Sequence, residues 1–323
     1  MKAVRVHSPG GPEALVYEDV ADPSPAAGQA LVKLGASGVN YIDVYFRTGQ
    51  YKAALPLTVG LEGAGVVTAL GTGVADLKVG DRVAWTGVPG AYAQMSAVPG
   101  DRLVKLPDGL SFKDGAAAML QGLTAHYLVT STYPLKPGDA CLIHAAAGGM
   151  GLLLCQMAKL RGATVIGTVS NEEKAALARG AGADHVINYS SQDFEAEVKR
   201  ITGGKGVNVV YDGVGASTFA KGFNCLRPRG LMALFGQASG PVPPLDLQVL
   251  NAGGSLFVTR PSLNHHIATR EELLQRSRDV LGWIADGKVK LRTEHQFPLA
   301  QAADAHRALE SRKTTGKILL IPS

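Results

Sequence analysis

The chain has 323 residues, of which 46% are hydrophobic and 18% are charged, and its formal net charge at pH 7 is +5. This length favours two domains, because single cores rarely grow past about 250–300 residues. No stretch approaches the ~20 apolar residues of a bilayer span, and the N-terminal residues have no signal-peptide core, so we expect no membrane partner. The basic residues are dispersed, which disfavours nucleic-acid binding.

The cysteines indicate a compartment. Cys141, Cys155 and Cys225 lie far apart in the sequence and are odd in number. This usage suits a reducing environment in which each thiol is a small core residue. We therefore expect a cytoplasmic protein.

Residues 1 to about 120 have the pattern of a β-rich domain. Short segments rich in β-branched residues alternate with Gly, Pro and Asp turns, which predicts a compact, irregular barrel. The segment 40–51, NYIDVYFRTGQY, lies between two of these strands and is rich in polar and aromatic side chains. The pattern becomes helical around 113–130. Strands are predicted at 2–7, 14–20, 29–39, 62–71, 81–87 and 90–98.

From Gly138 onward, strands and helices alternate, which implies a parallel sheet with helices on both faces. Each strand ends in small or polar residues. Ligands of such sheets bind beyond the carboxyl ends of the strands, so these loops should line one crevice. Strands are predicted at 140–144, 164–168, 185–188, 207–211 and 231–235, with helices from about 150, 171, 193 and 216.

The first of these turns, ACLIHAAAGGMG (140–151), is a variant dinucleotide fingerprint. Gly148 and Gly149 allow the backbone to approach a pyrophosphate, and Gly151 lets the helix pack close to the strand. Ala146 stands where the usual pattern has its first glycine. The alternative is a tight strand-to-helix turn that binds no ligand.

The C-terminal part is predicted to leave the parallel sheet. SLFVTRPSL (255–263) is a last strand that ends at Pro261 and offers an edge for self-association. We expect the remainder to return to the first domain. It should form a helix over 270–287, a strand pair near 289–298, a helix over 300–313 and a terminal strand over 316–322.

Several motifs occur in one order along the whole chain. They include SGVNYIDVYFRTGQY (37–51), GLEGAGVV (60–67), LQGLTAHYL (120–128), HAAAGGMG (144–151) and LFVTRPSL (256–263). With these motifs the chain resembles the zinc-free quinone oxidoreductase branch of the medium-chain dehydrogenases/reductases, the group that includes zeta-crystallin. The resemblance implies an α/β protein with a GroES-like barrel domain (1–122 and 262–323) and a Rossmann domain (123–261). It also implies NADPH-dependent reduction of quinones or conjugated carbonyls, in a homodimer or homotetramer.

Zinc enzymes that share the implied fold use a Cys and a His of a GHE motif as catalytic ligands. Here Asn40 resembles the Cys position, and Leu61 stands in place of the His, beside Glu62. A lone carboxylate does not hold zinc, which takes three protein ligands and a water at catalytic sites. We expect no metal site and interpret Glu62 as a structural acceptor within the barrel.

The end of the second parallel strand distinguishes the cofactors. NAD sites usually carry an Asp or Glu there, whereas Ser170 follows this strand. Ser170 and Glu173 have capping-box spacing, and Lys174 shares a helix face with Ser170 and would flank a 2′-phosphate; the alternative for Lys174 is a solvated surface residue. The resemblance places Ser170, Lys174, Tyr189 and Arg312 at NADPH-recognition positions. It implies further cofactor contacts at Asn40, Thr124, Gly148, Gly149, Met150, Gly213, Phe235, Gly236, Val258 and Arg260.

Without zinc, the substrate must be intrinsically electrophilic or must be polarised by side-chain donors. Candidate donors are Tyr45, Arg47, Tyr51 and Arg260. Asn40 and Asp43 are expected to fix the 40–51 segment and the nicotinamide amide. The alternative for the two tyrosines is packing within the barrel.

Three functions remain open at this level. The first is an NADPH:quinone oxidoreductase. The second is an NADPH-dependent enoyl or alkenal reductase acting on α,β-unsaturated carbonyls. The third is an NADPH-binding structural or RNA-binding protein, which the dispersed positive charge disfavours.

Overall fold

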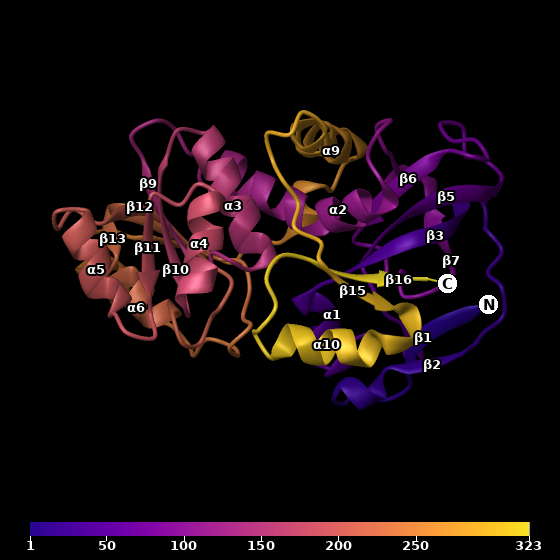
Figure 1. Cartoon of the computed structure of the whole chain (residues 1–323), viewed down its shortest axis with the longest axis horizontal. Coiled ribbons are helices and arrows are strands. Elements are labelled where there is room, and N and C mark those ends of the chain that lie inside the picture. The colour runs from indigo at the N-terminus through magenta and orange to yellow at the C-terminus, as the bar shows by residue number, and fades with distance from the viewer. Residues whose placement is uncertain (323) are drawn as a thin grey trace. The chain divides into compact units, whose positions relative to one another are not determined.

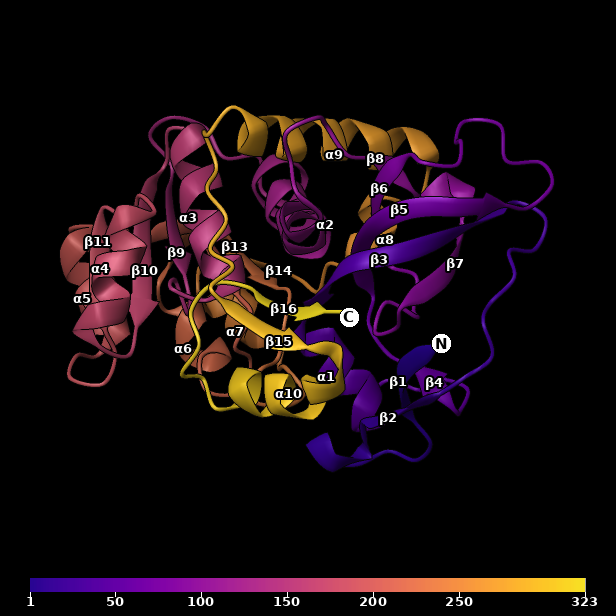
Figure 2. The same ribbon diagram turned by 45° about the vertical axis from the view of Figure 1, so that its right-hand side comes forward.

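The computed structural model describes residues 1–322 (Figures 1 and 2). The chain divides into two compact units. The first joins Met1–Leu123 to the segment that starts at Ile267, and the second is Thr124–His266.

The first unit is built around a seven-stranded sheet. Its longest strand, β3, pairs antiparallel with β5, β7 and the C-terminal strand β16. The last third of the chain thus completes a sheet begun by the first. The strands are β3 (Gln29–Val39), β5 (Glu62–Leu70), β6 (Arg82–Thr86), β7 (Met95–Pro99), β8 (Val104–Lys105), β15 (His295–Pro298) and β16 (Ile318–Ile321), and a smaller sheet holds β1 (Lys2–Val6), β2 (Val16–Asp19) and β4 (Leu57–Thr58).

Close packing of strands in this unit accounts for a glycine within β5. Trp85, Val32 and Val67 are buried among other apolar strand residues. At Gly65 of β5, a Cβ atom would lie 2.0 Å from the carbonyl oxygen of Lys33. Only glycine permits this close approach of two strands.

Helices flank the sheet of the first unit. α1 occupies most of the 40–51 segment, for which we expected no helix, and its start is capped by Asp43, whose carboxylate accepts from the Asn40 amide at 2.9 Å. α10 packs on β15 and β16 (Figure 2). The strand pair predicted near 289–298 is wrong, because only β15 forms there. The helices are α1 (Tyr41–Arg47), α2 (Phe112–Tyr127, which contains the boundary between the units), α9 (Arg270–Ala285), α10 (Ala302–Glu310) and the 3-10 turns Pro12–Ala14, Gly100–Arg102 and Leu299–Gln301.

The second unit is a six-stranded sheet in the order β11-β10-β9-β12-β13-β14, with every pair parallel. Figure 1 shows α3 and α4 on one face and α5 on the other. The strands are β9 (Ala140–Ile143), β10 (Thr164–Val169), β11 (His185–Asn188), β12 (Val207–Asp212), β13 (Leu226–Leu234) and β14 (Phe257–Thr259). The helices are α3 (Gly149–Leu160), α4 (Glu172–Gly180), α5 (Phe194–Ile201), α6 (Phe219–Phe223), α7 (Gln248–Ala252), α8 (Leu263–His266) and the π-helical turn Leu128–Thr132.

The strand order of the second unit contains a topological switch point. Leu142, Ile166 and Val210, from three adjacent strands, pack with Phe194 and Phe219 of the covering helices. Strand order reverses at β9, which has β10 on one side and β12 on the other. Doubly wound sheets bind ligands at such a switch point. The predicted α/β class, with a β-rich unit and a doubly wound parallel-sheet unit, is confirmed. Across residues 1–322 we find no helix with the length and apolar character needed to cross a membrane.

Candidate active site

The glycine turn after β9 leads directly into α3. Gly148 is its N-cap in extended conformation, and Gly149 and Met150 form its first turn. The first amides of a helix have no carbonyl partner within it and carry positive partial charge, which suits a diphosphate. A Cβ atom at Gly151 would lie 2.2 Å from the carbonyl oxygen of Ala145. The turn and the helix are therefore in contact at a position that only glycine can occupy.

The next loops place a polar group beside this turn. Ser170 follows β10 and Tyr189 follows β11, and the Tyr189 amide donates to Val169 O at 3.0 Å, so the two residues end adjacent strands. Lys174 lies in the first turn of α4, where its amide donates to Asn171 Oδ1 at 2.9 Å. Asn171 is thus the N-cap. The predicted capping box of Ser170 with Glu173 is wrong, because the chain stays extended through Asn171 (φ −162°).

The residues that follow β12 and β13, at the same carboxyl end of the sheet, are also closely packed. A Cβ atom at Gly236 would lie 2.7 Å from the carbonyl oxygen of Gly213. The Phe235 amide donates to Asp212 O at 2.9 Å. The backbones that follow β12 and β13 are thus in close contact, and the Phe235 ring lies against Gly213.

The remaining predicted cofactor residues differ in their surroundings. Arg260 follows β14 and donates to Leu234 O at 3.1 Å. Val258 lies within β14 and is 37% exposed, Thr124 of α2 is buried, and Arg312 of the first unit follows α10 with a φ of 58°.

A buried polar cluster in the first unit surrounds Asn40. Lys317 donates from Nζ to Glu62 Oε2 at 2.5 Å and to Asn40 Oδ1 at 2.7 Å, and Asn40 Nδ2 donates to Glu62 Oε2 at 2.9 Å. Glu62 Oε1 also accepts from the Leu120 amide at 2.6 Å. These bonds confirm the interpretation of Glu62 as a structural acceptor. Gln121, for which the sequence suggested no role, donates from Nε2 to Asn40 Oδ1 at 3.2 Å.

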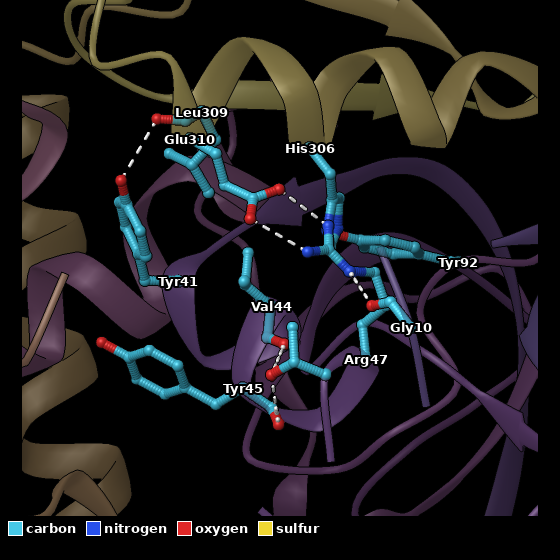
Figure 3. A network of polar contacts seen from close by, with 10 residues as sticks. Gly10, Tyr41, Val44, Tyr45, Arg47, Tyr92, His306, Leu309 and Glu310 are labelled. Carbon is cyan, nitrogen blue, oxygen red and sulfur yellow. Dashed lines mark hydrogen bonds and ion pairs between the residues drawn. The ribbon is translucent and has the colours of Figure 1, made fainter. Parts of the chain in front are cut away.

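A second set of buried residues forms a hydrogen-bonded chain that joins α1 to α10 (Figure 3). Arg47, 1% exposed, makes a bidentate contact with Glu310 at 2.8 and 2.9 Å and donates to His306 Nδ1 at 3.1 Å. His306 Nε2 lies 3.1 Å from the Tyr92 hydroxyl, which donates to Asp43 Oδ2 at 2.9 Å. A guanidinium only donates, so Nδ1 of His306 accepts and its proton sits on Nε2. The hydrogen bonds that link Arg47, His306 and Tyr92 therefore all point toward Asp43, whereas Arg47 also donates to Glu310.

Burial shifts the pKa values of the ionisable groups in this hydrogen-bonded chain. Desolvation raises the pKa of Asp43 to about 7, although its bonds from the Asn40 amide and Tyr92 oppose the change. Desolvation, together with the Arg47 charge, lowers the pKa of His306 to about 3. Burial also raises the pKa of Tyr92 well above its ordinary value. His306 is therefore neutral at pH 7, whereas Asp43 titrates near that pH.

The predicted donors on α1 lie in two places. The Tyr45 ring is 5.2 Å from that of Tyr51 and 6.4 Å from that of Tyr41, with tilted geometry. In Figure 3 the Tyr45 hydroxyl points away from Arg47, which is directed into the α10 contact. The structure thus brings Tyr45 and Tyr51 together and separates Arg47 from them.

No three His, Cys, Asp or Glu side chains gather to hold a metal ion anywhere in residues 1–322. His144 is buried at the end of β9, and its Nδ1 contacts Thr168 Oγ1 at 3.1 Å. Burial lowers its pKa. Sequence reasoning assigned no role to Lys317, Tyr92 or His306, whose partners lie far away in the sequence.

Known proteins resemble both units. Residues 26–108 match the alcohol dehydrogenase GroES-like domain model, and residues 149–280 match the zinc-binding dehydrogenase model. The chain is 45% identical to a quinone oxidoreductase of Pseudomonas aeruginosa over 99% of both chains. It is also 45% identical to a 2-haloacrylate reductase of a Burkholderia species, over 99% of this chain and 98% of that one.

A solved structure extends the likeness to three dimensions. The Escherichia coli quinone oxidoreductase complexed with NADPH superposes with a TM-score of 0.98 and 45% identity, covering 100% of both chains. Full-length identity at this level includes the barrel, the glycine turn and the C-terminal segment together. The chain belongs to the quinone oxidoreductase family of the medium-chain dehydrogenases/reductases.

Proposed function

We propose that this protein reduces quinones with NADPH. The observation that carries the proposal is that a glycine turn leads from β9 into α3, while the neighbouring strand β10 is followed by polar residues without a carboxylate, Ser170 and Asn171. The full-length likeness to proteins named quinone oxidoreductase supports the substrate class.

The glycine turn fits the diphosphate of a dinucleotide. Gly148, Gly149 and Met150 present backbone at the start of α3, and Gly151 allows the helix to pack directly against the backbone of the turn at Ala145. Along the sheet edge, Gly213, Phe235 and Gly236 give the same backbone character. We include Thr124, Val258 and Arg260 in the same proposed cofactor site.

The neighbouring loops fit a 2′-phosphate. Ser170 and Tyr189 bring hydroxyls to the ends of adjacent strands, and Lys174 brings a positive charge from α4. We assign Arg312 to the same group. A charged hydrogen bond contributes about 1.5–3 kcal/mol, so Lys174→Ala should raise the KM for NADPH at least tenfold and leave the KM for NADH unchanged. An equal effect on both cofactors would remove the assignment.

When bound, the nicotinamide supplies the hydride. The chain must then orient the ring and stabilise negative charge on the substrate oxygen. We assign the second task to Tyr45 and Tyr51, whose rings are adjacent. Asn40 and Asp43 hold the α1 segment in place, and Arg47, bound to Glu310 and His306, positions the helix instead of touching substrate.

Conjugated carbonyls are a second candidate substrate class, since a relative of equal identity is named 2-haloacrylate reductase. Initial rates with a para-quinone and with an α,β-unsaturated carboxylate or aldehyde, each with NADPH, separate the two. We expect kcat/KM to be higher for the quinone. A higher value for the conjugated carbonyl would reassign the substrate and keep the cofactor.

We also propose a cytoplasmic homo-oligomer. The three cysteines are buried and free of disulfides, which suits a reducing compartment. β14 is an edge strand on which Phe257 is 60% exposed and Val258 37% exposed; exposed apolar edges favour pairing with another chain. Light scattering should give a multiple of the chain mass, and Phe257→Lys should lower it.

A further inference from the structure

The amide of Asn40 is held in one orientation by two charged groups. An ammonium can only donate and an ionised carboxylate can only accept. Lys317 Nζ therefore requires the Asn40 oxygen, and Glu62 Oε2 requires the Asn40 nitrogen. Nδ2 also donates to Gly38 O at 3.3 Å. Lys317, Glu62 and Asn40 are all at most 3% exposed, so no bulk water competes for these bonds.

This orientation is passed on to Gln121. Asn40 Oδ1 accepts from Lys317 and, at 3.2 Å, from Gln121 Nε2. A flipped Gln121 would bring two amide oxygens together, which is repulsive. The Gln121 nitrogen must then face Asn40, and its oxygen must face the other way.

The oxygen that results has no partner. Gln121 Oε1 is a buried atom that accepts no hydrogen bond from the described residues 1–322. Asn40 has all its polar positions engaged, so in this cluster the acceptor that remains is on Gln121. Buried acceptors are nearly always satisfied in proteins, by protein, water or ligand.

We propose that Gln121 Oε1 accepts a hydrogen bond from a neutral N–H or O–H donor of the bound ligand, and that Lys317 and Glu62 are positioning residues that keep this oxygen turned toward it. The inference rests on the proposed function, which offers two such donors. One is the carboxamide NH2 of the nicotinamide, and the other is a hydroxyl of the hydroquinone product. A ligand carbonyl at the same place would meet oxygen with oxygen and is disfavoured.

The test compares NADPH with its 3-acetylpyridine analogue, in which a methyl group replaces the carboxamide NH2. Both dissociation constants are measured by calorimetry without a second substrate, for the wild type and Gln121→Met. A neutral hydrogen bond contributes about 0.5–1.5 kcal/mol, so the wild type should prefer NADPH by about 3- to 10-fold if the carboxamide is the donor. In Gln121→Met the preference should fall to about one.

If the hydroxyl is the donor, the two cofactors bind alike. The inhibition constant of the hydroquinone should then rise several-fold in Gln121→Met, whereas that of its dimethyl ether should not change. The inference is overturned if Gln121→Met alters neither the cofactor preference nor the hydroquinone constant. A wild type that binds NADPH in no measurable amount would instead overturn the proposed function, so the two failures are distinct.

The positioning role has its own measurement. Lys317→Met/Glu62→Gln removes both charged groups that orient Asn40 and leaves no unpaired carboxylate, so it should abolish the same preference. Leu320→Ala, a core truncation in β16, which begins directly after Lys317, is the matched control for destabilisation and should keep the preference. Should this variant fail to fold, Lys317→Gln/Glu62→Gln, in which an amide side chain at each position can still form hydrogen bonds, takes its place. A preference retained in the folded variant that lacks both charges contradicts the positioning role.

Discussion

Asp43 and His306 belong to one buried hydrogen-bonded chain, and burial raises the pKa of Asp43 but lowers the pKa of His306. The pKa of Asp43 is about 7, above its ordinary 3.8, so the folded protein binds this proton more tightly than the unfolded chain does. The pKa of His306 is about 3, below its ordinary 6.5, so the unfolded chain binds that proton more tightly. Asp43 therefore makes stability fall as pH rises from about 4 to 7, and His306 makes it rise between about 3 and 6.5.

When one of the two groups is replaced, its contribution to the pH dependence of stability should disappear and that of the other group should remain. Each unit of pKa difference corresponds to about 1.4 kcal/mol, so changes of a few kcal/mol are expected between pH 4.5 and 7.5. Relative to the wild type, Asp43→Asn should be more stable at pH 7.5 than at pH 4.5. His306→Gln should show the reverse. Urea unfolding at the two pH values measures both, and differences of the same sign in the two variants would contradict the account.

Individual residues were predicted unevenly from the sequence. The internal role expected of Asp43 agrees with its place in the cap of α1, three residues after Asn40. Lys317 and His306 carry no such signal. Lys317 meets Asn40 across 277 positions, and His306 meets Arg47 across 259. Contacts of that kind are set by the fold, so a single sequence offers no local pattern for them.

At the scale of elements, Arg47 connects α1 to α10. Arg47→Met would leave Glu310 and His306 Nδ1 without their shared donor. Removing one partner of a buried pair costs about 3–5 kcal/mol; since Glu310 is about one-third exposed, we expect the lower end. Thermal unfolding should show a clear decrease in Tm.

Arg307→Met is the matched control for that variant. Arg307 is also bonded to an acidic residue of α10, Asp304, but both side chains are more than half exposed. Exposed pairs contribute about 0–1 kcal/mol, so its Tm should stay close to that of the wild type. Equal losses for the two arginines would show that burial does not decide the strength of the contact.

The turn between β9 and α3 depends on Gly151. In Gly151→Ala the new Cβ would lie 2.2 Å from Ala145 O and 2.6 Å from Ala146 Cα, both backbone atoms. The helix start must therefore move, and we expect NADPH affinity to fall by more than tenfold, measured by fluorescence titration. Gly180→Ala on α4, where a Cβ meets nothing within 4 Å, should bind NADPH normally. Normal binding by Gly151→Ala would contradict the role of the turn.

Elements with strong periodicity could be predicted from the sequence. The strand 185–188 coincides with β11, and the strand predicted at 29–39 coincides with β3. α1 was missed because its seven residues are too few for a periodic pattern, although the Asn40–Asp43 cap was present. The predicted strand pair near 289–298 is single because β15 pairs with β16, a long-range neighbour, rather than with a local hairpin partner.

At the scale of the whole molecule, the chain builds two units with different tasks. The second unit has the sheet, the switch point and the glycine turn of a dinucleotide-binding fold. The first unit provides Tyr45, Tyr51 and the buried polar cluster around Asn40. Within residues 1–322, no three His, Cys, Asp or Glu side chains lie close enough together to hold a metal ion. The fold class was predictable because alternation of strands and helices extends over more than 100 residues. The choice of substrate was not, because it depends on side chains brought together from distant segments.

The most direct test of the account is the rate of cofactor oxidation by the purified protein with a para-quinone, with NADPH and NADH at equal concentration. The account predicts quinone-dependent oxidation of NADPH at a rate at least tenfold above that with NADH. It also predicts that the cofactor preference narrows in Lys174→Ala. Oxidation of NADH at an equal or higher rate, or no quinone-dependent oxidation of either cofactor, would contradict it.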